Sequence, residues 1–259
     1  MHPYIQIFGR TIPLYGVFAA VGLIASIIYI KIAERRKKGL EADIELAAVY
    51  SLIGMIAGAK LLYLIIAFPA LLQDIEAAEL TFYELILKYM QGGFVFYGGL
   101  AGGVLAVYIY ARAVRVSFDD LCSVLVPVIP LFHTFGRIGC FMSGCCYGIE
   151  SGLFGIAFTD SLYAPNGVKL VPVQLMESFA ELVLFIVLLV MIKKGAAGIT
   201  LLFTWTLSYA AVRFALEFLR GDEERGFIGP LSTAQVMSVV LVLIVIAVIF
   251  VRKRRAAGC

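Results

Sequence analysis

Charged residues are scarce in this sequence of 259 residues: they make up 15% of it, whereas 62% of the residues are hydrophobic. Soluble domains carry about 25% charged residues, and a chain this apolar cannot cover its surface with polar groups. The mean hydropathy of +0.97 points the same way. The composition therefore excludes an ordinary soluble domain and predicts an integral membrane protein.

Other scarcities narrow the class further. The formal net charge is only +3, and the basic residues form short clusters at the ends of apolar runs, which argues against nucleic acid as a partner. No Ser/Pro-rich linker divides the chain, so we expect one membrane domain over residues 1–259. No basic segment precedes the first apolar run, and the charged cluster at 34–38 follows it, so we expect this run to stay in the mature protein.

Seven apolar runs are long enough to cross the hydrocarbon core, which takes about 17 to 25 residues. They begin near Ile12, Leu46, Phe94, Leu121, Val173, Gly198 and Ala234. The loops on one side are rich in lysine and arginine, as at 35–38 and 252–255, whereas acidic residues accompany the few basic ones on the other side. Basic loops stay in the cytoplasm. We therefore predict an all-α fold of about seven transmembrane helices, with the N-terminus outside and the C-terminus cytoplasmic.

Two outer segments differ from ordinary loops. Residues 80–93 are amphipathic and aromatic-rich, which suits a segment that lies in the membrane interface and gates the lateral entry of a lipid. In residues 144–174, β-branched and aromatic residues alternate with Gly, Asp, Pro and Asn. This pattern predicts a small extracytoplasmic lobe, at about 144–172, with short strands.

Two arginines, Arg137 and Arg213, lie inside apolar runs. A guanidinium at that depth costs roughly 2.5 to 3.5 kcal/mol, so it normally faces a partner, a water-filled cavity or an anion. One interpretation is a buried ion pair with Glu177 or Glu217. The other is an anionic ligand, and the phosphate of a lipid is the obvious anion at this depth, because a guanidinium binds its oxygens bidentately.

Helical spacing places further polar groups beside these arginines. Tyr209, Arg213 and Glu217 follow one another at intervals of four residues and therefore share a helix face, with Arg220 about a turn beyond. His133 lies four residues before Arg137, on the same face. A histidine in a span is either a packing residue or a proton carrier.

Pairs of glycines in the apolar runs are explained by helix packing. Gly98 and Gly99 have glycine partners four residues on, a spacing that allows helices to approach closely. Tyr97, by itself, suits the aromatic belt at the interface.

Cys140, Cys145 and Cys146 lie on the predicted outer side, where disulfides form. Their spacing lacks the Cys-x-x-Cys pairs or histidine partners of a zinc site, so we expect packing or disulfide residues and no metal.

Taken together, several motifs resemble those of bacterial prolipoprotein diacylglyceryl transferase. They are His2-Pro3 with Tyr15-Gly16, GAKLLY at 58–63, GFVFYGG at 93–99, GRIG at 136–139, VPVQLME at 171–177 and YAAVRFALEFLR at 209–220. The six occur in the family's order and along most of the chain. The sequence is therefore identified as a member of this family.

The resemblance implies a reaction. The family moves the diacylglyceryl group of phosphatidylglycerol to the lipobox cysteine thiol in the signal peptide of a prolipoprotein, which forms a thioether and releases glycerol 1-phosphate, in the bacterial plasma (inner) membrane. No cofactor is implied. The runner-up interpretations are a related membrane transferase that uses phosphatidylglycerol with a different acceptor, and a non-catalytic phosphatidylglycerol-binding membrane protein.

The resemblance also implies roles for residues. As catalytic residues it implies Tyr97, Arg137, Tyr209 and Arg213. As substrate-binding residues it implies Tyr15, Lys60, Gly98, Gly99, His133, Gln174, Glu177, Glu217 and Arg220. This chain departs from the family in having a tyrosine at 97, where many members have histidine, a lysine at 60 for an arginine, and Cys-Phe-Met-Ser-Gly-Cys after the GRIG motif. One of the phenols, at Tyr97 or Tyr209, is expected to organise proton removal from the acceptor thiol.

Overall fold

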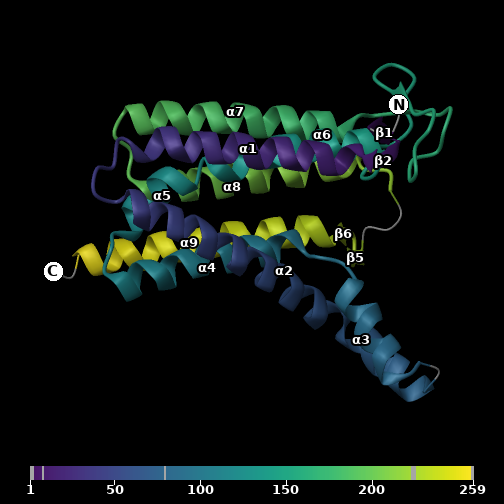
Figure 1. Ribbon diagram of the computed structural model, residues 1–259, viewed down its shortest axis with the longest axis horizontal. Coiled ribbons are helices and arrows are strands. Elements are labelled where there is room, and N and C mark those ends of the chain that lie inside the picture. Colours follow the sequence, from purple (N-terminus) through teal and green to yellow (C-terminus); the bar gives the residue numbers. More distant parts are fainter. Residues whose placement is uncertain (1–2, 8, 79, 223–225, 258–259) are drawn as a thin grey trace. The chain divides into compact units, whose positions relative to one another are not determined.

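The computed structural model describes residues 3–7, 9–78, 80–222 and 226–257. Within these residues it contains seven helices that are long and apolar enough to cross a membrane (Figure 1). These spans are Leu14–Glu34, Glu41–Ala77, Phe96–Val114, Phe118–Ser143, Val173–Lys193, Gly198–Leu219 and Thr233–Arg254. The prediction of an all-α protein with about seven spans is confirmed. His2, part of the first matched motif, lies outside the described residues.

The chain divides into two compact units, which are described separately. Unit 1 comprises residues 1–36 and 122–259, and unit 2 comprises residues 37–121. The prediction of one membrane domain over 1–259 stays a prediction.

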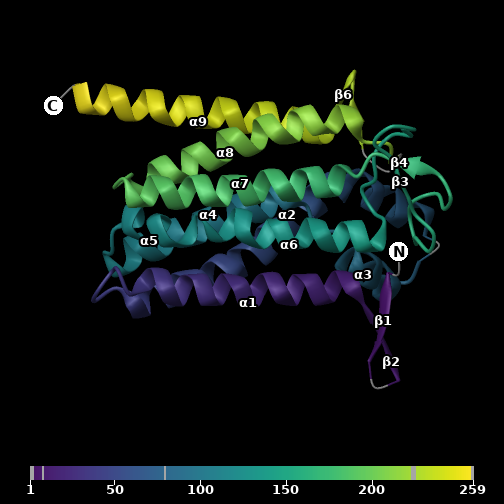
Figure 2. The same ribbon diagram turned by 90° about the horizontal axis from the view of Figure 1, so that it is seen from above.

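Five helices build unit 1. They are α1 (Leu14–Glu34), α6 (Val128–Ser143), α7 (Val173–Lys193), α8 (Gly198–Leu216) and α9 (Thr233–Ala257). Figure 2 shows them in the order α1, α6, α7, α8, α9, and each packs on the next. The short helix α5 (Phe118–Leu125) precedes α6, and the 3-10 helix η1 (Glu217–Leu219) continues α8. Because α6, α7 and α8 are neighbours, polar side chains on their facing surfaces can meet.

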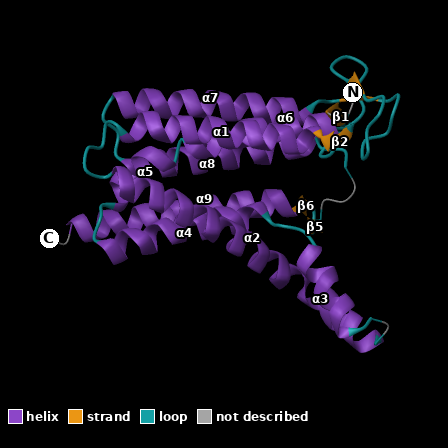
Figure 3. Ribbon diagram, in the orientation of Figure 1, coloured by secondary structure: helices purple, strands orange, loops and turns teal. Residues whose placement is uncertain are grey.

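The strands of unit 1 are short and antiparallel (Figure 3). A hairpin of β1 (Tyr4–Ile7) and β2 (Arg10–Pro13), which the sequence patterns did not predict, leads directly into α1. Two further pairs are β3 (Ile156–Ala157) with β4 (Lys169–Leu170), and β5 (Phe227–Ile228) with β6 (Leu231–Ser232). The β3–β4 pair belongs to the segment between α6 and α7, so the expected small lobe with short strands is present.

The lobe is attached to the helices by its own core and by backbone hydrogen bonds. Phe158 and Leu170 from the lobe pack with Phe141 of α6. Near the end of η1, Leu219 O accepts from the N–H of Ile149, and the N–H of Gly221 donates to Tyr147 O. The segment that follows α6 is therefore fixed at the end of α8 and η1.

Unit 2 consists mainly of α2 (Glu41–Ala77) and α4 (Phe96–Val114), with α3 (Phe82–Gln91) between them in sequence. α2 and α4 pack so closely that a Cβ added to Gly98 would lie 2.4 Å from Gly58 O, and one added to Gly54 would lie 2.5 Å from Gly102 O. Only glycine permits this approach of two helix backbones. The amphipathic segment expected at 80–93 forms α3.

Candidate functional site

A buried carboxylate on α7, that of Glu177, lies between two arginines. Arg137 Nη2 on α6 donates to Glu177 Oε1 at 2.8 Å, and Arg213 Nη1 on α8 donates to Glu177 Oε2 at 3.2 Å. Arg213 also forms an ion pair of 2.8 Å with Glu217, the first residue of η1. The carboxylate of Glu177 is 1% exposed. The ion-pair interpretation of the two arginines is therefore correct, and both candidate partners take part.

His133 extends this cluster along the same face of α6. Its Nδ1 lies 2.9 Å from Glu181 Oε1, and its Nε2 lies 3.8 Å from Glu177 Oε1. Trp205 Nε1 donates to the other oxygen of Glu181 at 3.1 Å. Sequence reasoning missed Glu181. The signal was present, because a second carboxylate four residues after Glu177 in an apolar run shares its helix face and needs a buried partner.

The Tyr209 side chain is packed in the same cluster. Its ring stacks on Trp205 at a centroid distance of 5.3 Å and an interplanar angle of 6°, and it meets the His133 ring edge to face at 5.5 Å. The residue is 2% exposed. The predicted shared face of Tyr209, Arg213 and Glu217 thus faces α6 and α7.

Two polar atoms at the border of the cluster have no hydrogen-bond partner among the described residues. They are Arg137 Nε and Gln174 Oε1, both buried. The amide nitrogen of Gln174 donates to the carbonyl of Cys145 at 2.7 Å. Because buried polar groups are nearly always hydrogen-bonded, one donor and one acceptor here are suited to a polar ligand.

Arg220 and Tyr15 lie near the end of this cluster that is next to Cys146 and Cys140. The Arg220 side chain is buried and binds Asp222 with two nitrogens. Burial alone would lower the pKa of Arg220, but the Asp222 carboxylate and other nearby groups outweigh it and raise the pKa, so the residue stays cationic. Tyr15, at the start of α1, packs against Gly139 of α6, where an added Cβ would lie 3.2 Å from its ring.

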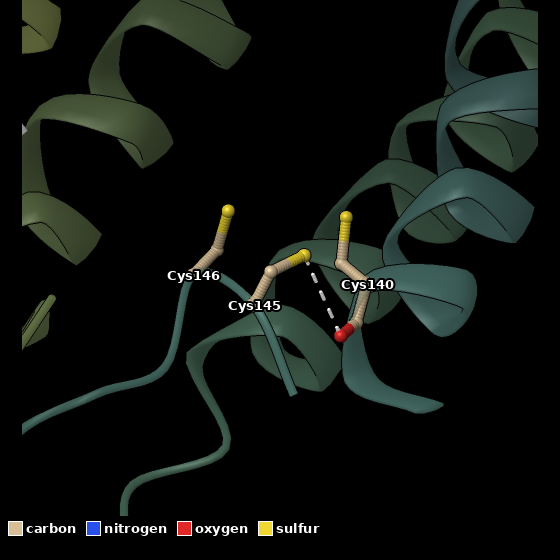
Figure 4. Close-up of side chains that lie close together, drawn as sticks. All are labelled: Cys140, Cys145 and Cys146. Carbon is tan, nitrogen blue, oxygen red and sulfur yellow. Dashed lines mark hydrogen bonds between the residues drawn. The ribbon is translucent and has the colours of Figure 1, made fainter. Parts of the chain in front are cut away.

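The cysteines that follow Arg137 form a group of their own (Figure 4). Cys140, Cys145 and Cys146 are partly buried free thiols, so none of them forms the disulfide that was considered from the sequence. Their three sulfurs lie within 4.8 Å of one another. Hydrogen bonds from the other two thiols, together with the charges of Arg137 and Arg220, lower the pKa of Cys146, whereas hydrogen bonding and burial raise that of Cys145.

Four predicted site residues belong to unit 2. Lys60 Nζ donates to the carbonyls of Met90 and Gly92, at 2.9 and 3.0 Å, and thus binds the end of α3. Gly98 and Gly99 contact the α2 backbone. Tyr97 is half-buried, with its ring 5.8 Å from that of Phe96. Their roles in binding or catalysis stay predictions, as do those of the residues in unit 1.

Comparison with known proteins identifies the family. The family model of prolipoprotein diacylglyceryl transferase matches residues 3–251. Over 251 residues the chain is 34% identical to the phosphatidylglycerol–prolipoprotein diacylglyceryl transferase of Clostridium tetani, which covers 96% of this chain and 97% of that protein. It is 33% identical to a second such protein, from Clostridium perfringens, over 92% of this chain and 90% of that one, and 30% identical to one from Clostridioides difficile, over 92% and 89%. The chain therefore belongs to the prolipoprotein diacylglyceryl transferase family.

Proposed function

We propose that this protein transfers the diacylglyceryl group of phosphatidylglycerol to the lipobox cysteine thiol of a prolipoprotein signal peptide, in the bacterial plasma (inner) membrane. Its membership of the family supports this activity, since its curated relatives carry the corresponding name. The single observation that supports a site for the chemistry is the buried group of Arg137, Glu177 and Arg213 inside membrane-spanning helices.

The reaction requires charge stabilisation at the phosphate. A carbon–sulfur bond forms at the terminal glycerol carbon of the diacylglyceryl group, and the bond from that carbon to the phosphate oxygen breaks. The electron pair stays with the phosphate, which leaves as glycerol 1-phosphate. Donors that are already in position stabilise such developing charge most strongly in a site shielded from water. Arg137 and Arg213 supply these donors in our proposal.

Glu177 has a positioning role in this proposal. Each guanidinium has five N–H groups, and the hydrogen bonds to Glu177 engage one nitrogen of each arginine. Arg137 Nε is without a partner among the described residues. The carboxylate thus offsets the repulsion between two arginines and fixes their orientation, while other N–H groups bind the phosphate.

The acceptor thiol must also lose its proton, because the thiolate is the nucleophile and a free cysteine has a pKa of about 8.5. One of the phenols, Tyr209 or Tyr97, organises this proton removal as a phenolate that a nearby arginine favours. Substrate binding is assigned to Tyr15, Lys60, Gly98, Gly99, His133, Gln174, Glu217 and Arg220. Of the two phenols, Tyr209 lies within the charged cluster of unit 1.

Transfer from labelled phosphatidylglycerol to a lipobox peptide by the purified protein tests this function. We expect label on a peptide that carries the lipobox cysteine and none on the same peptide with serine there. Lipid binding without transfer to any thiol would contradict the proposed activity and indicate a binding protein. Label on another acceptor alone would indicate a related transferase.

A further inference from the structure

The three clustered cysteines form a set of metal ligands. Cys140 lies in the last turn of α6, and Cys145 and Cys146 follow the helix, so the spacing is Cys-x4-Cys-Cys. Their sulfurs lie within 4.8 Å of one another, and the Cys145 sulfur lies between the other two in Figure 4. A tetrahedral zinc ion with zinc–sulfur bonds of about 2.3 Å holds its sulfurs about 3.8 Å apart. Rotation about each Cα–Cβ bond covers the difference.

The backbone around the thiols is held by many contacts. Gly144, with a φ of +78°, reverses the chain at the end of α6, and Cys146 has a φ of +59°. Gln174 of α7 donates to the Cys145 carbonyl at 2.7 Å, and the Cys145 thiol donates to the Cys140 carbonyl at 3.7 Å. The N–H of Gly148 donates to Val171 O at 3.1 Å. These backbone contacts therefore hold the three cysteine side chains close to one another.

The number and exposure of the ligands indicate an open site. Among the described residues, the group contains three ligands and no histidine, aspartate or glutamate as a fourth. All three cysteines are only partly buried. Structural zinc sites are closed by four protein ligands, whereas sites that act on a substrate have three and leave one position for it.

We propose that Cys140, Cys145 and Cys146 bind one zinc ion through three thiolates, and that the fourth position takes the thiol of the acceptor cysteine. Three thiolates are soft ligands, which select zinc over magnesium or calcium. The sequence-based expectation of packing or disulfide residues followed from the linear spacing of the cysteines. The chain reversal at Gly144 brings their three sulfurs together, which linear spacing does not reveal.

The surrounding charges suit such a centre. Three thiolates and one Zn²⁺ carry a net charge of −1, and Arg137 and Arg220 act electrostatically on Cys146. Arg137 thus belongs both to the proposed phosphate site and to the surroundings of the thiols, which brings nucleophile and leaving group to the same region.

The second half of this proposal rests on the proposed transferase function. A thiol that coordinates a metal ion is deprotonated, and its proton passes to water. The bound sulfur then forms the bond to the glycerol carbon as the carbon–oxygen bond breaks, and the electron pair leaves with the phosphate. No oxidant or reductant is needed. The thioether product carries no charge and is the poorer ligand, so it leaves the metal.

Cobalt is the probe for the site itself. Co²⁺ is added to the full-length, reduced protein in detergent, without oxygen, and the absorption spectrum is recorded. We expect one Co²⁺ per chain, with a thiolate-to-cobalt charge-transfer band in the near ultraviolet that disappears when Zn²⁺ is added. Cys145→Ser and Cys146→Ser should each weaken binding at least tenfold. Cys122→Ser is the matched control, because this buried cysteine lies outside the cluster, and the cobalt spectrum of the variant should be unchanged.

Three outcomes would overturn the metal site. They are the absence of the charge-transfer band, a band of full strength in the cluster variants, and a disulfide among the three cysteines in the purified protein. Circular dichroism spectra and size-exclusion profiles of the serine variants show whether they are folded. If a single serine variant fails to fold, cadmium binding to the unaltered protein gives the same information through its cadmium–thiolate absorption.

The role of the fourth position has its own test. A lipobox peptide should change the visible cobalt bands when it carries cysteine and should leave them unchanged when it carries serine. Removal of zinc by a chelator should lower transfer at least tenfold, and added zinc should restore it. Full transfer by the metal-free protein would overturn the metal's role and leave the proposed function intact. Normal cobalt and peptide spectra without any transfer would instead contradict the proposed function.

Discussion

Arg137 on α6 and Arg213 on α8 share one acceptor, the carboxylate of Glu177 on α7. The two interpretations of these arginines, as members of a buried ion pair and as ligands of an anion, are therefore compatible. A shared carboxylate brings two cations together that would otherwise repel each other. It also restricts their orientation, which matters for a planar guanidinium that binds phosphate oxygens with two parallel N–H groups.

Removing the shared charge should destabilise the protein. In Glu177→Gln the carboxylate is lost while the shape is kept, which leaves two buried guanidinium groups without their common anion. Breaking a buried ion pair in this way typically costs roughly 3 to 5 kcal/mol. We expect a lower thermal unfolding temperature in detergent and lower transfer activity. The control is Glu150→Gln, at an exposed position in the lobe, which should change neither. Equal stability of the two variants would contradict the role of Glu177.

Conservative replacement of the arginines tests the proposed phosphate site. Arg137→Lys and Arg213→Lys keep the positive charge but lose the planar fork. Loss of a transition-state donor typically costs a factor on the order of a hundred to a thousand in rate. We therefore expect the transfer rate to fall by a factor of about a hundred to a thousand in each variant. Both variants should still elute from size-exclusion chromatography in detergent as a folded protein. Ordinary activity of both lysine variants in the purified assay would show that neither arginine binds the phosphate.

The sequence was sufficient for the helices and for the faces that their residues share. Hydrophobic run length predicted the spans, and the spacing of four residues placed His133 and Arg137 on one face, where both reach Glu177. Helical periodicity does not predict which helices pack against each other. For that reason the contact between Glu181 and Trp205, across α7 and α8, could not be predicted.

The cysteines show a second limit. Their linear spacing differs from that of known zinc motifs, and a spacing rule assumes a particular turn between the ligands. Here the turn depends on left-handed backbone at Gly144 and Cys146 and on the hydrogen bond from Gln174. A cysteine is an unusual residue for a positive φ, so no pattern in the sequence predicted that the three sulfurs would meet.

The basic residues at the ends of the spans predict how the chain is oriented in the membrane. The last span ends in Arg252, Lys253 and Arg254, and the basic residues of the other loops favour the same side. A reporter fused after Cys259 should be active only in the cytoplasm, and one inserted after Asn166, in the lobe, only outside. A C-terminus on the outer side would contradict the predicted orientation and would place the lobe in the cytoplasm.

Helix α3 should loosen in acid. Glu84 accepts hydrogen bonds from the Thr81 hydroxyl at 2.7 Å and from its backbone N–H at 2.8 Å, and these bonds lower the pKa of Glu84. Its contribution to stability is therefore complete above the ordinary pKa of glutamate and is lost as the pH falls through the lowered value. Amide hydrogen exchange in α3, corrected for the intrinsic rate, should rise over that range.

The matched variants separate this cap from general effects of acid. Glu84→Gln keeps a side chain that can still accept from Thr81 but cannot titrate, so the acid-induced rise in exchange should disappear. Glu76→Gln, at an exposed position in α2, should retain the rise. Identical pH dependence in the two variants would show that Glu84 does not stabilise α3 through its charge.

The final prediction concerns proton removal from the acceptor thiol. Tyr209→Phe keeps the ring that stacks on Trp205 but removes the hydroxyl, and Tyr97→Phe does the same in unit 2. Loss of a general base typically lowers the rate by a factor of about 10² to 10⁴, so we expect at least one variant to show a loss of this size at neutral pH. The loss should shrink above a pH of about 8.5, where the thiol ionises without help. Transfer rates from pH 6 to 10, measured with the same lipobox peptide, test this. If both variants transfer at the normal rate throughout, the phenols are not required, and a metal ion at the three cysteines becomes sufficient to account for the thiolate.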